Sequence, residues 1–541
     1  MLNYLSKKIR FWQIQNQKTN HENDKMNKQD NTQNFSQSKI SLNLKENLNN
    51  LKNILGPSDD IIMREFAFGK KAQISAALIY IDGMIDKTLV NESIIRPLMY
   101  DSRSSFAEES LEVKNIDIIK RSMLSVGEVK QVTTFDEVVE SCLSGDTILL
   151  INGAQEALII SSRGWESRGV EDPKTESIVR GPREGFSESL RTNTTLLRRK
   201  LKTPDLTMET MTIGRKSKTD VCLVYLKGVV NPQLIKEARQ RLTRIDTDGI
   251  LESGYIEQFI EDAPFSIFST IGNSERPDAV AAKILEGRAA VLVDGSPFVL
   301  TVPMVFIESF QSSEDYYSRP YYASIVRVIR FIAFMTSVLG PASYVAVTTF
   351  HQELLPTPLL FTVAAAVEGT PFPAMIEIIA MGVIFEILRE AGIRLPRPVG
   401  QAISIVGALV VGESAVSAGL IGEPVVIVIA LTAVSGFAVP AQTDSGAILR
   451  FVFVILAGTM GGVGVIVGLL GVLIHLASLR SFGTPYLSPL APLSPYDLKD
   501  VFIRVPTWAM ITRPRTIGWK NSQREKLILK PNPPPEKNQK K

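Results

Sequence analysis

The sequence is poor in the residues that most often carry catalysis, redox chemistry and metal binding. Its 541 residues include two cysteines, Cys142 and Cys222, and three histidines, His21, His351 and His475. No CxxC, HExxH, P-loop or nucleophile-elbow pattern occurs. We therefore predict no metal, no organic cofactor and no enzymatic activity, and we expect both cysteines to be reduced and buried.

An excess of charge is also lacking. With 59 Lys and Arg against 56 Asp and Glu, the formal net charge is +3, which argues against nucleic acid as a main partner. Residues 1–43 are rich in Asn, Gln, Lys and Ser with few apolar anchors, so we predict a disordered tail. Because the chain starts polar, without a signal peptide, its N-terminal half is expected to stay in the cytoplasm.

Long apolar runs are confined to the C-terminal half. A helix needs about 20 apolar residues to cross a bilayer core of about 30 Å, and three of five runs reach that length. We predict a polytopic α-helical membrane domain, in contact with lipid, at residues 313–482. The alternative is the buried core of a soluble helical protein. The runs are Ile325–Phe350, Met375–Leu388, Ala402–Ile421, Val425–Val439 and Ile448–Leu479.

The flanking charges indicate which side each end faces. Basic residues begin the first run at Arg327 and Arg330 and dominate residues 483–541, so that C-terminal tail is expected in the cytoplasm. Two ends on one side require an even number of crossings, which five runs do not give. Either Glu377–Glu390 lies in the interface or re-enters, or the fifth run breaks at Gly458–Gly464 into a hairpin.

The N-terminal half predicts an α/β fold that occurs twice, at residues 44–165 and 212–312. Strands are expected at Ala72–Ile81, Thr147–Ile151 and Thr219–Leu226, and helices at Asn91–Leu98 and Phe135–Leu143. Asn152-Gly153 lies between two apolar runs and predicts a hairpin with a type I′ turn. A second hairpin is expected around Asp294-Gly295. At an offset of 142, matching pairs are Asp136 and Asp278, Leu143 and Leu285, Gly145 and Gly287, Leu150 and Leu292, Gly153 and Gly295, and Leu158 and Leu300. Two related subdomains follow, with chance matching of common α/β signals as the alternative.

Residues 166–211, between the two copies, are dense in Arg, Gly and Pro and are expected to be a connector. Its glycines allow close backbone approach, and Arg180 and Arg183, with Glu184 beside them, would form an anion-binding or interface loop. A segment that only packs the subdomains, or a neighbouring subunit, is the alternative.

The third apolar run, Gln401–Leu420, has two distinct faces on a helical wheel. Small residues, which let helices pack closely in lipid, form one face: Ser404, Ala408, Gly412, Ala415 and Gly419. The other carries Ile403, Val406, Val410, Glu413, Ser414 and Ser417. Exposed to lipid near the midplane, a glutamate would cost about 2.5–3.5 kcal/mol. We interpret this face as lining a permeation path, with a helix contact or lipid exposure as alternatives.

Distinctive motifs lie in both halves of the chain. The N-terminal ones are Gly164-Trp-Glu-Ser-Arg168, Arg180-Gly-Pro-Arg-Glu-Gly-Phe186, Asn193 with Leu196-Leu-Arg-Arg199, and Glu275-Arg-Pro-Asp278. The C-terminal ones are Pro371-Phe-Pro373, Leu388-Arg-Glu-Ala-Gly392, Gln401–Gly412 and Ser481-Phe-Gly-Thr-Pro-Tyr486. Through them the chain resembles, over about residues 45–490, the A subunit of the GerA-type spore germinant receptors of endospore-forming bacteria.

The resemblance implies a subunit of a receptor that also contains B and C subunits, in the inner membrane of the dormant spore. Such receptors respond to small nutrients, bound directly or through the B subunit, and trigger ion release. The family also contains a similar protein from the operon for spore dipicolinate transport, which stays an alternative. A membrane-anchored enzyme is an alternative of another class, disfavoured by the missing catalytic motifs.

One helix with a single small-residue face does not enclose a pore, whereas a ring of identical helices does. We therefore expect a homo-oligomer through the membrane domain, with the Val406 and Val410 face toward the axis. These valines would exclude water in the closed state, and Glu413 beside them would favour cations.

Overall fold

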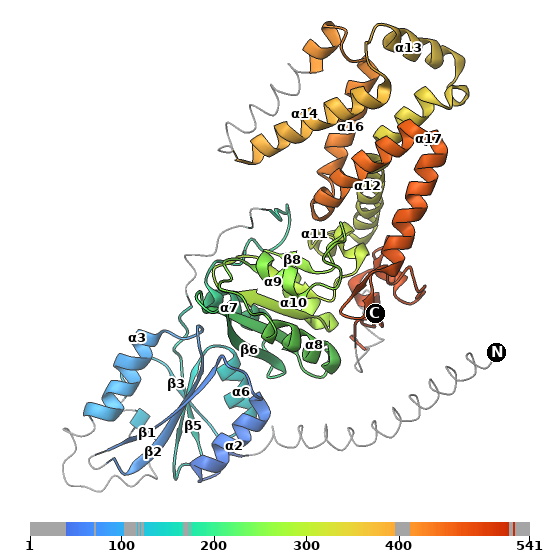
Figure 1. Ribbon diagram of the computed structural model, residues 1–541. Coiled ribbons are helices and arrows are strands. Elements are labelled where there is room, and N and C mark those ends of the chain that lie inside the picture. Colours follow the sequence, from blue (N-terminus) through green and yellow to red (C-terminus); the bar gives the residue numbers. More distant parts are fainter. Residues whose placement is uncertain are drawn as a thin grey trace, which may run out of the picture. The chain divides into compact units, whose positions relative to one another are not determined.

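The architecture divides at the point where the apolar runs begin. The structure, a computed structural model, describes residues 39–69, 72–101, 116, 119–120, 124–165, 173, 175–394, 412–518 and 523–524. Two units are present (Figure 1). Unit 1 comprises Met1–Ser177, Pro182–Phe259 and Asn273–Thr301, and unit 2 comprises Ile178–Gly181, Ile260–Gly272 and Val302–Lys541. Of the predicted disordered tail, residues 1–38 lie outside the described residues.

A five-stranded sheet with helices on both faces forms the first half of unit 1. Its order is β1 (Ile61–Phe68), β2 (Ile74–Ile81), β4 (Thr147–Ile151), β5 (Ala157–Ile160) and β3 (Val129–Val132). Successive side chains of a strand point to opposite faces. One face therefore packs on α2 (Leu44–Leu55) and α6 (Phe135–Leu143), and the other on the segment from α3 (Lys87–Leu89) onward.

The second half of unit 1 repeats this topology. Its sheet has the order β6 (Leu206–Ile213), β7 (Thr219–Leu226), β9 (Ala289–Val293), β10 (Val299–Val302) and β8 (Gly272–Ser274). Helices α7 (Leu190–Lys200) and α10 (Pro277–Glu286) cover one face. Further helices are α8 (Pro232–Thr243) and α9 (Ser253–Ile260). The N-terminal half thus contains the two α/β sheets that the sequence predicts.

A buried asparagine makes the same contacts in both copies. Asn47 donates from Nδ2 to the Ser41 carbonyl (2.6 Å) and accepts at Oδ1 from the Ser41 N–H (2.9 Å). Asn193 does the same with the Ser187 carbonyl (2.6 Å) and N–H (2.8 Å). Both asparagines are 0% exposed. In both copies the asparagine bonds to the backbone of the serine six positions before it. Chance matches of turn residues would not reproduce this pair of contacts, so it strongly supports a repeated unit.

Both predicted hairpins form, but the predicted type I′ turn is wrong. Residues 152–156 connect β4 to β5, and among them only Gly153 has a positive φ, 91°, whereas a type I′ turn needs two such residues. The reason is that Asn152 caps a helix instead. Its Oδ1 accepts the N–H of Leu44 at 3.1 Å, and Asp294 accepts the N–H of Leu190 at 3.0 Å in the second copy.

Several elements differ from the prediction. The helix expected at 91–98 consists of wider π-helical turns, Val90–Ile95 and Pro97–Asp101. Strands β1, β3, β6 and β8 have no counterpart in the prediction. β1 and β6 lie at the edges of their sheets, and many of their side chains are half-buried or exposed, which blurs the apolar alternation.

The predicted connector, residues 166–211, supplies α7 and the start of β6 to the second sheet. Most residues of α7 are polar. Leu196 and Leu197 are nevertheless at most 2% exposed and belong to the same buried cluster as Val224 and Leu292. Because the last turn of α7 is basic, the composition of this segment does not reveal its narrow apolar face. The second copy therefore begins near α7 rather than at residue 212.

Unit 2 is built from helices. They are α11 (Glu314–Tyr317), α12 (Pro320–Thr349), α13 (Thr357–Glu368), α14 (Ala374–Arg394), α16 (Glu423–Gly436) and α17 (Thr443–Ser478). Within the described residues two helical segments, Pro320–Thr349 and Pro440–Ser478, are long and apolar enough to cross a membrane, while α13 and α16 are apolar but shorter. Helix α14 carries more charge, including Glu377, Glu386 and Arg389.

Helix α17 is bent back on itself. Gly461 has φ 62° and ψ −142°, which are not helical values. A Cβ on Gly468 would lie 2.8 Å from the Phe453 ring, so the second arm lies against the first. The structure thus contains the break that the sequence offered as one of two alternatives at Gly458–Gly464. Glycine is required at the bend because other residues rarely adopt this left-handed φ.

Candidate functional site

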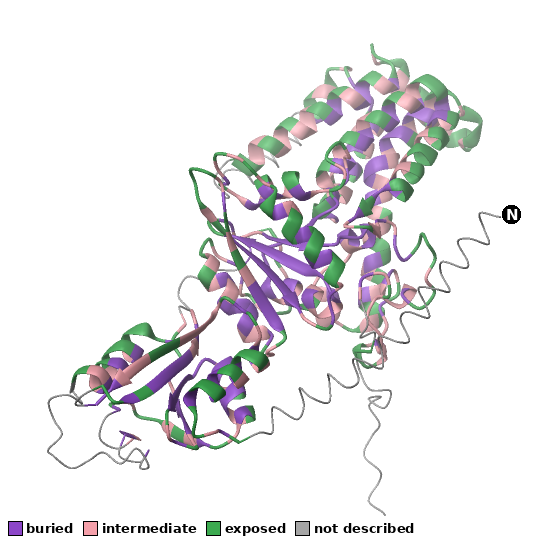
Figure 2. Cartoon of the chain, turned by 60° about the horizontal axis from the view of Figure 1, so that its bottom comes forward, coloured by how far each residue is buried: buried purple, intermediate pink, exposed green. Residues whose placement is uncertain are grey.

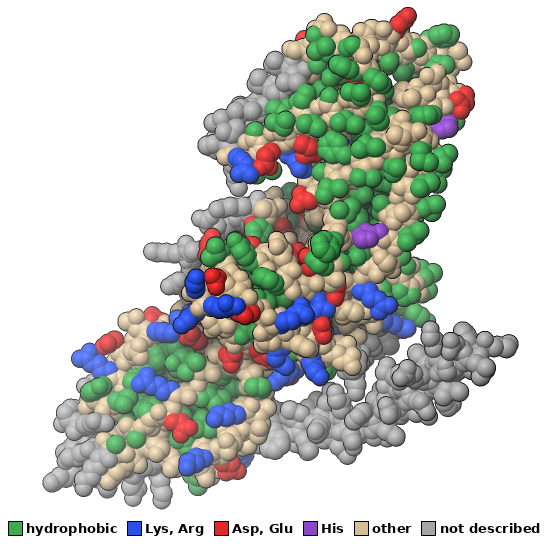
Figure 3. All heavy atoms as spheres, in the orientation of Figure 1, with side chains coloured by type: hydrophobic (Ala, Val, Ile, Leu, Met, Phe, Trp, Pro, Cys, Tyr) green, Lys and Arg blue, Asp and Glu red, His purple; other side chains and the backbone are tan. Residues whose placement is uncertain are grey.

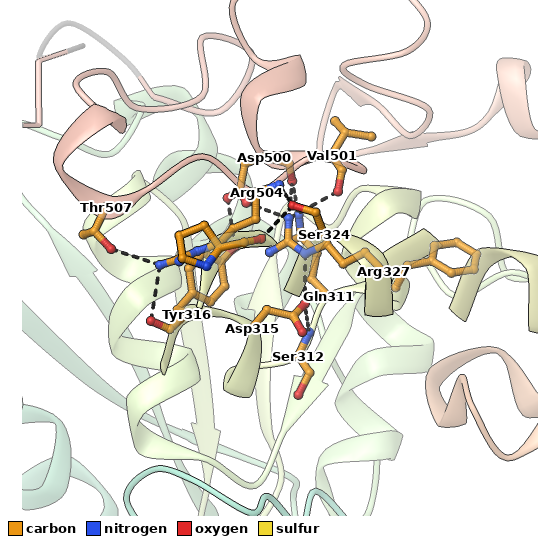
Figure 4. A network of polar contacts seen from close by, with 12 residues as sticks. Gln311, Ser312, Asp315, Tyr316, Ser324, Arg327, Asp500, Val501, Arg504 and Thr507 are labelled. Atoms are coloured by element: carbon orange, nitrogen blue, oxygen red, sulfur yellow. Dashed lines mark hydrogen bonds and ion pairs between the residues drawn. The ribbon is translucent and has the colours of Figure 1, made fainter. Parts of the chain in front are cut away.

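A buried arginine organises the start of the first long apolar helix (Figure 4). The Arg327 side chain in α12 is 1% exposed. Its Nε lies 2.9 Å from Asp315 Oδ2 of α11, and its Nη1 lies 2.7 Å from Asp500 Oδ1 in the C-terminal segment. Arg330 adds a second contact to Asp315 at 2.9 Å. Breaking such a buried ion pair leaves uncompensated charge and costs about 3–5 kcal/mol.

The C-terminal segment completes this network. The Tyr316 hydroxyl donates to Asp500 Oδ2 at 2.8 Å, and the Arg504 N–H donates to Ser324 Oγ at 3.0 Å. The Arg504 guanidinium also donates to the Tyr316 carbonyl at 3.3 Å. Residues 483–541, predicted as a basic tail, therefore include a part that folds into unit 2. We call this cluster of Asp315, Tyr316, Arg327, Asp500 and Arg504 the joint.

The side chains of the joint bind mainly to one another and to nearby backbone groups. Its groups are arginines, carboxylates and a tyrosine held in mutual hydrogen bonds, without a nucleophile beside a base. Among the described residues, no three His, Cys, Asp or Glu side chains gather as metal ligands. The arrangement can keep the C-terminal segment and the first long helix in a fixed geometry.

Both cysteines are free and buried, as predicted. Burial raises the pKa of Cys142 and of Cys222 to about 12. At neutral pH both side chains therefore remain thiols, which are poor nucleophiles.

Two of the distinctive sequence motifs meet in unit 1. Arg276, whose side chain is 2% exposed, donates from Nη2 to the Pro182 carbonyl at 2.8 Å and to Asp278 Oδ2 at 3.0 Å. The Phe186 N–H donates to the Glu275 carbonyl at 2.7 Å. Hydrogen bonds thus hold residues 182–186 against the Glu275–Asp278 motif.

The neighbouring Glu176 is held in the same way. Its carboxylate accepts a hydrogen bond from Ser274 Oγ at 2.7 Å. Burial raises the pKa of Glu176, and the Ser274 hydrogen bond and nearby cations oppose that shift only in part.

The three residues of the predicted anion-binding or interface loop differ in their surroundings. Glu184 pairs with Arg199 at 3.4 Å and Lys200 at 3.3 Å, both on α7. Arg180 and Arg183 are exposed. The contacts of Glu184 fit the packing interpretation, and the role of the two arginines stays a prediction.

The predicted pore helix is described only at its C-terminal end. Ile403, Ser404, Val406, Ala408 and Val410 lie outside the described residues. The described part of this helix covers residues 412–417, and Gly419 has φ 64° in the turn that follows.

The described residues divide by exposure. Gly412 is buried, and a Cβ there would lie 3.4 Å from Val426 Cγ1 of α16. Ala415 packs against the core of unit 2. Glu413, Ser414 and Ser417 are exposed on the single chain. Gly412 and Ala415 therefore pack within unit 2, whereas the polar residues are left uncovered by the same chain.

Sequence reasoning missed the buried ion pairs. Within unit 1, Arg198 is 0% exposed and its guanidinium contacts both carboxylate oxygens of Asp60 at 2.9 Å, which joins the two sheets. Arg198 belongs to a motif that the sequence singled out, but Asp60 lies 138 positions away. The same holds for Asp315 and Asp500 beside Arg327.

In the described part of the chain, two α/β sheets are followed by helices, two of which are long and apolar enough to cross a membrane, and this combination defines the class of protein. The particular family follows from sequence comparison. The chain belongs to the GerA family, described as Bacillus/Clostridium GerA spore germination protein, whose profile matches residues 49–516.

Individual relatives agree with this family. Spore germination protein KA of Bacillus subtilis (strain 168) is 45% identical over 496 residues, which cover 91% of this chain and 90% of the relative. The uncharacterized membrane protein YfkQ of the same organism is 42% identical over 487 residues, covering 90% and 93%. These relatives support a role in spore germination and association with a membrane, and neither carries an enzyme's name.

A solved structure is also similar in sequence. It is the crystal structure of the N-terminal domain of the A subunit of the Bacillus megaterium spore germinant receptor GerK3. It is 38% identical, covers 50% of this chain and 98% of that chain, and has a TM-score of 0.40.

Proposed function

We propose that this chain is the A-type subunit of a nutrient receptor that triggers spore germination. The observation that carries the proposal is the family match over residues 49–516, which runs through both units. The receptor would contain B and C subunits and act without enzymatic chemistry. Its nutrient would bind either here or on the B subunit.

The chain would cross the spore inner membrane six times, with unit 1 in the cytoplasm. The crossings would be α12, α14, the helix ending at residue 417, α16 and the two arms of α17. The bend at Gly461 supports this count, since it turns one apolar run of 36 residues into two arms. An even number of crossings returns the C-terminal segment to the side where α12 begins, as its contacts with Arg327 require.

Copies of the chain would surround an ion path. The helix ending at residue 417 would turn Ile403, Val406, Val410, Ser414 and Ser417 to the axis, with Glu413 beside them. The packing of Gly412 against α16 supports this orientation, because it directs the opposite, polar side away from the same chain. Apolar constrictions of this kind close by excluding water.

Deletion of the gene tests the receptor role. Spores without this chain should lose germination to one class of nutrient while still responding to a trigger that bypasses receptors. The matched control restores the gene at another locus. Full nutrient responses in the deletion strain, or loss of both responses, would contradict the proposal.

A further inference from the structure

Unit 2 contains a cavity bordered by α12, α14, α16 and the beginning of α17. Apolar side chains such as Phe334, Phe385 and Phe437 form part of its wall. Two arginines, Arg389 of α14 and Arg450 of α17, also line it. Figure 3 shows charged side chains gathered at the C-terminal end of α14.

The charges at this cavity do not balance. Glu386 Oε2 lies 2.6 Å from Arg389 Nη2, and its Oε1 lies 3.2 Å from Arg450 Nη1. Within the described residues, no other carboxylate pairs with either arginine. One carboxylate thus serves two guanidinium groups, which leaves a net charge of +1 beside an apolar cavity.

The hydrogen bonds of Arg450 to Ser337 and Glu386 use its Nε and Nη1 and leave further guanidinium N–H groups able to donate. Its side chain is 7% exposed, and its Nε donates to the Ser337 carbonyl at 3.1 Å. Its Nη2 lies 3.9 Å from where a Cβ on Gly436 would sit, and Gly436 is part of the cavity wall. A planar guanidinium with spare N–H groups matches the oxygen pairs of carboxylates and phosphates.

Helix direction adds to the same preference. Thr443 and Gly446, in the first turns of α17, line the cavity. The N-terminal end of a helix carries a partial positive charge that favours anions. An unbalanced positive charge in an apolar setting is costly, and a bound anion removes that cost.

We propose that this cavity binds one anion, recognised through a phosphate or carboxylate group by Arg389 and Arg450. The group would come either from a small soluble anion or from the headgroup of an anionic phospholipid. Glu386 competes with that anion for the two guanidinium groups and so sets its affinity.

The test uses the purified full-length chain in a neutral detergent. Inorganic phosphate and short-chain phosphatidylglycerol are titrated separately at constant ionic strength against chloride, and the Tm is followed. A saturable rise with phosphate indicates a soluble anion, and a rise with phosphatidylglycerol alone indicates a headgroup. If neither phosphate nor phosphatidylglycerol gives a saturable rise in Tm, the proposal is overturned.

Variants separate binding from a merely structural role. Arg450→Gln and the more exposed Arg389→Gln should each raise the half-saturating concentration about tenfold or more, because each removes charged hydrogen bonds. Arg394→Gln, on the same helix but paired with Glu390 at 2.6 Å, is the control and should change nothing. The Glu386→Gln variant should bind the anion about tenfold more tightly, because it removes the carboxylate that competes for the two guanidinium groups. Equal half-saturation in wild type, Arg389→Gln and Glu386→Gln overturns the proposal.

Discussion

The two units of this chain differ in how far their apolar side chains are buried (Figure 2). In unit 1 every residue of the central strands β4 and β9 is buried. In unit 2 only 28% of the most apolar stretch of each long helix is buried, and Ile325, Ile329 and Ile332 of α12 are each more than half exposed. Large exposed apolar surfaces mark contact with lipid or other proteins. Unit 1 therefore completes its core within the chain, whereas unit 2 needs surroundings to complete its burial.

Polar groups complete the contrast. Unit 1 uses buried polar contacts in equivalent positions of its two copies, at Asn47 and Asn193. Unit 2 places its densest buried ion network at one end of α12, around Arg327. Substitutions in unit 1 should therefore destabilise the structure locally, with similar effects at equivalent positions of the two copies. Substitutions in the Arg327 network should destabilise the helices of unit 2 as a whole.

The largest effect is expected at the joint. Arg327→Met should leave Asp315 and Asp500 buried without their cation, a loss of about 3–5 kcal/mol. Immunoblots should then find little of the chain in the membrane. Arg319→Met, an exposed arginine just before α12, is the matched control. Wild-type amount and Tm for Arg327→Met would show that the joint does not hold unit 2 together.

A smaller, local effect is expected for the ion pair between the two sheets. Arg198→Met should destabilise unit 1 by about 3 kcal/mol because Asp60 loses its buried partner. Hydrogen–deuterium exchange should speed up in α7 and β1 but not in α17. Arg199→Met, its more exposed neighbour, should have little effect, and the double variant Arg198→Met with Asp60→Leu should recover part of the loss. Faster exchange in α17 as well would break the separation of the units.

The duplication predicts paired effects. Asn47→Leu and Asn193→Leu should each cost about 1–3 kcal/mol, since each leaves a buried N–H and carbonyl without partners. Exchange should speed up in α2 for the first variant and in α7 for the second, to a similar extent. Strongly unequal effects would mean that only one copy depends on this contact.

The smallest effect is expected at the bend of α17. Gly461→Ala should cost about 1–2 kcal/mol, because alanine is unfavourable at a positive φ, and its Cβ would meet Phe350 at 2.8 Å. The Tm in detergent should fall, whereas Gly471→Ala, with open space around it, should keep the wild-type Tm. An unchanged Tm for Gly461→Ala would argue for a straight α17.

Sequence patterns predicted the regular interior of unit 1 because alternation and turn residues act over a few positions. Helix Phe135–Leu143 and strand Thr147–Ile151 have the predicted bounds. The glycines at 458–464 marked the bend as one of two alternatives, and the structure contains it. The joint could not be predicted, because Arg327 and Asp500 lie 173 positions apart and nothing local pairs them. From the sequence alone, Arg327 indicates only the orientation of the first apolar run.

The ion path remains a prediction from the pattern of Gln401–Leu420, and one measurement tests it most directly. It is the ion content of dormant spores that carry Val410→Ala or Val406→Ala, determined before any nutrient is added. Smaller side chains should weaken the water-excluding constriction, so these spores should leak ions and lose dormancy, whereas Ala408→Leu on the packing face should reduce assembly and give a silent receptor. If both valine variants assemble normally and keep wild-type ion content and nutrient dependence, the chain does not line the path.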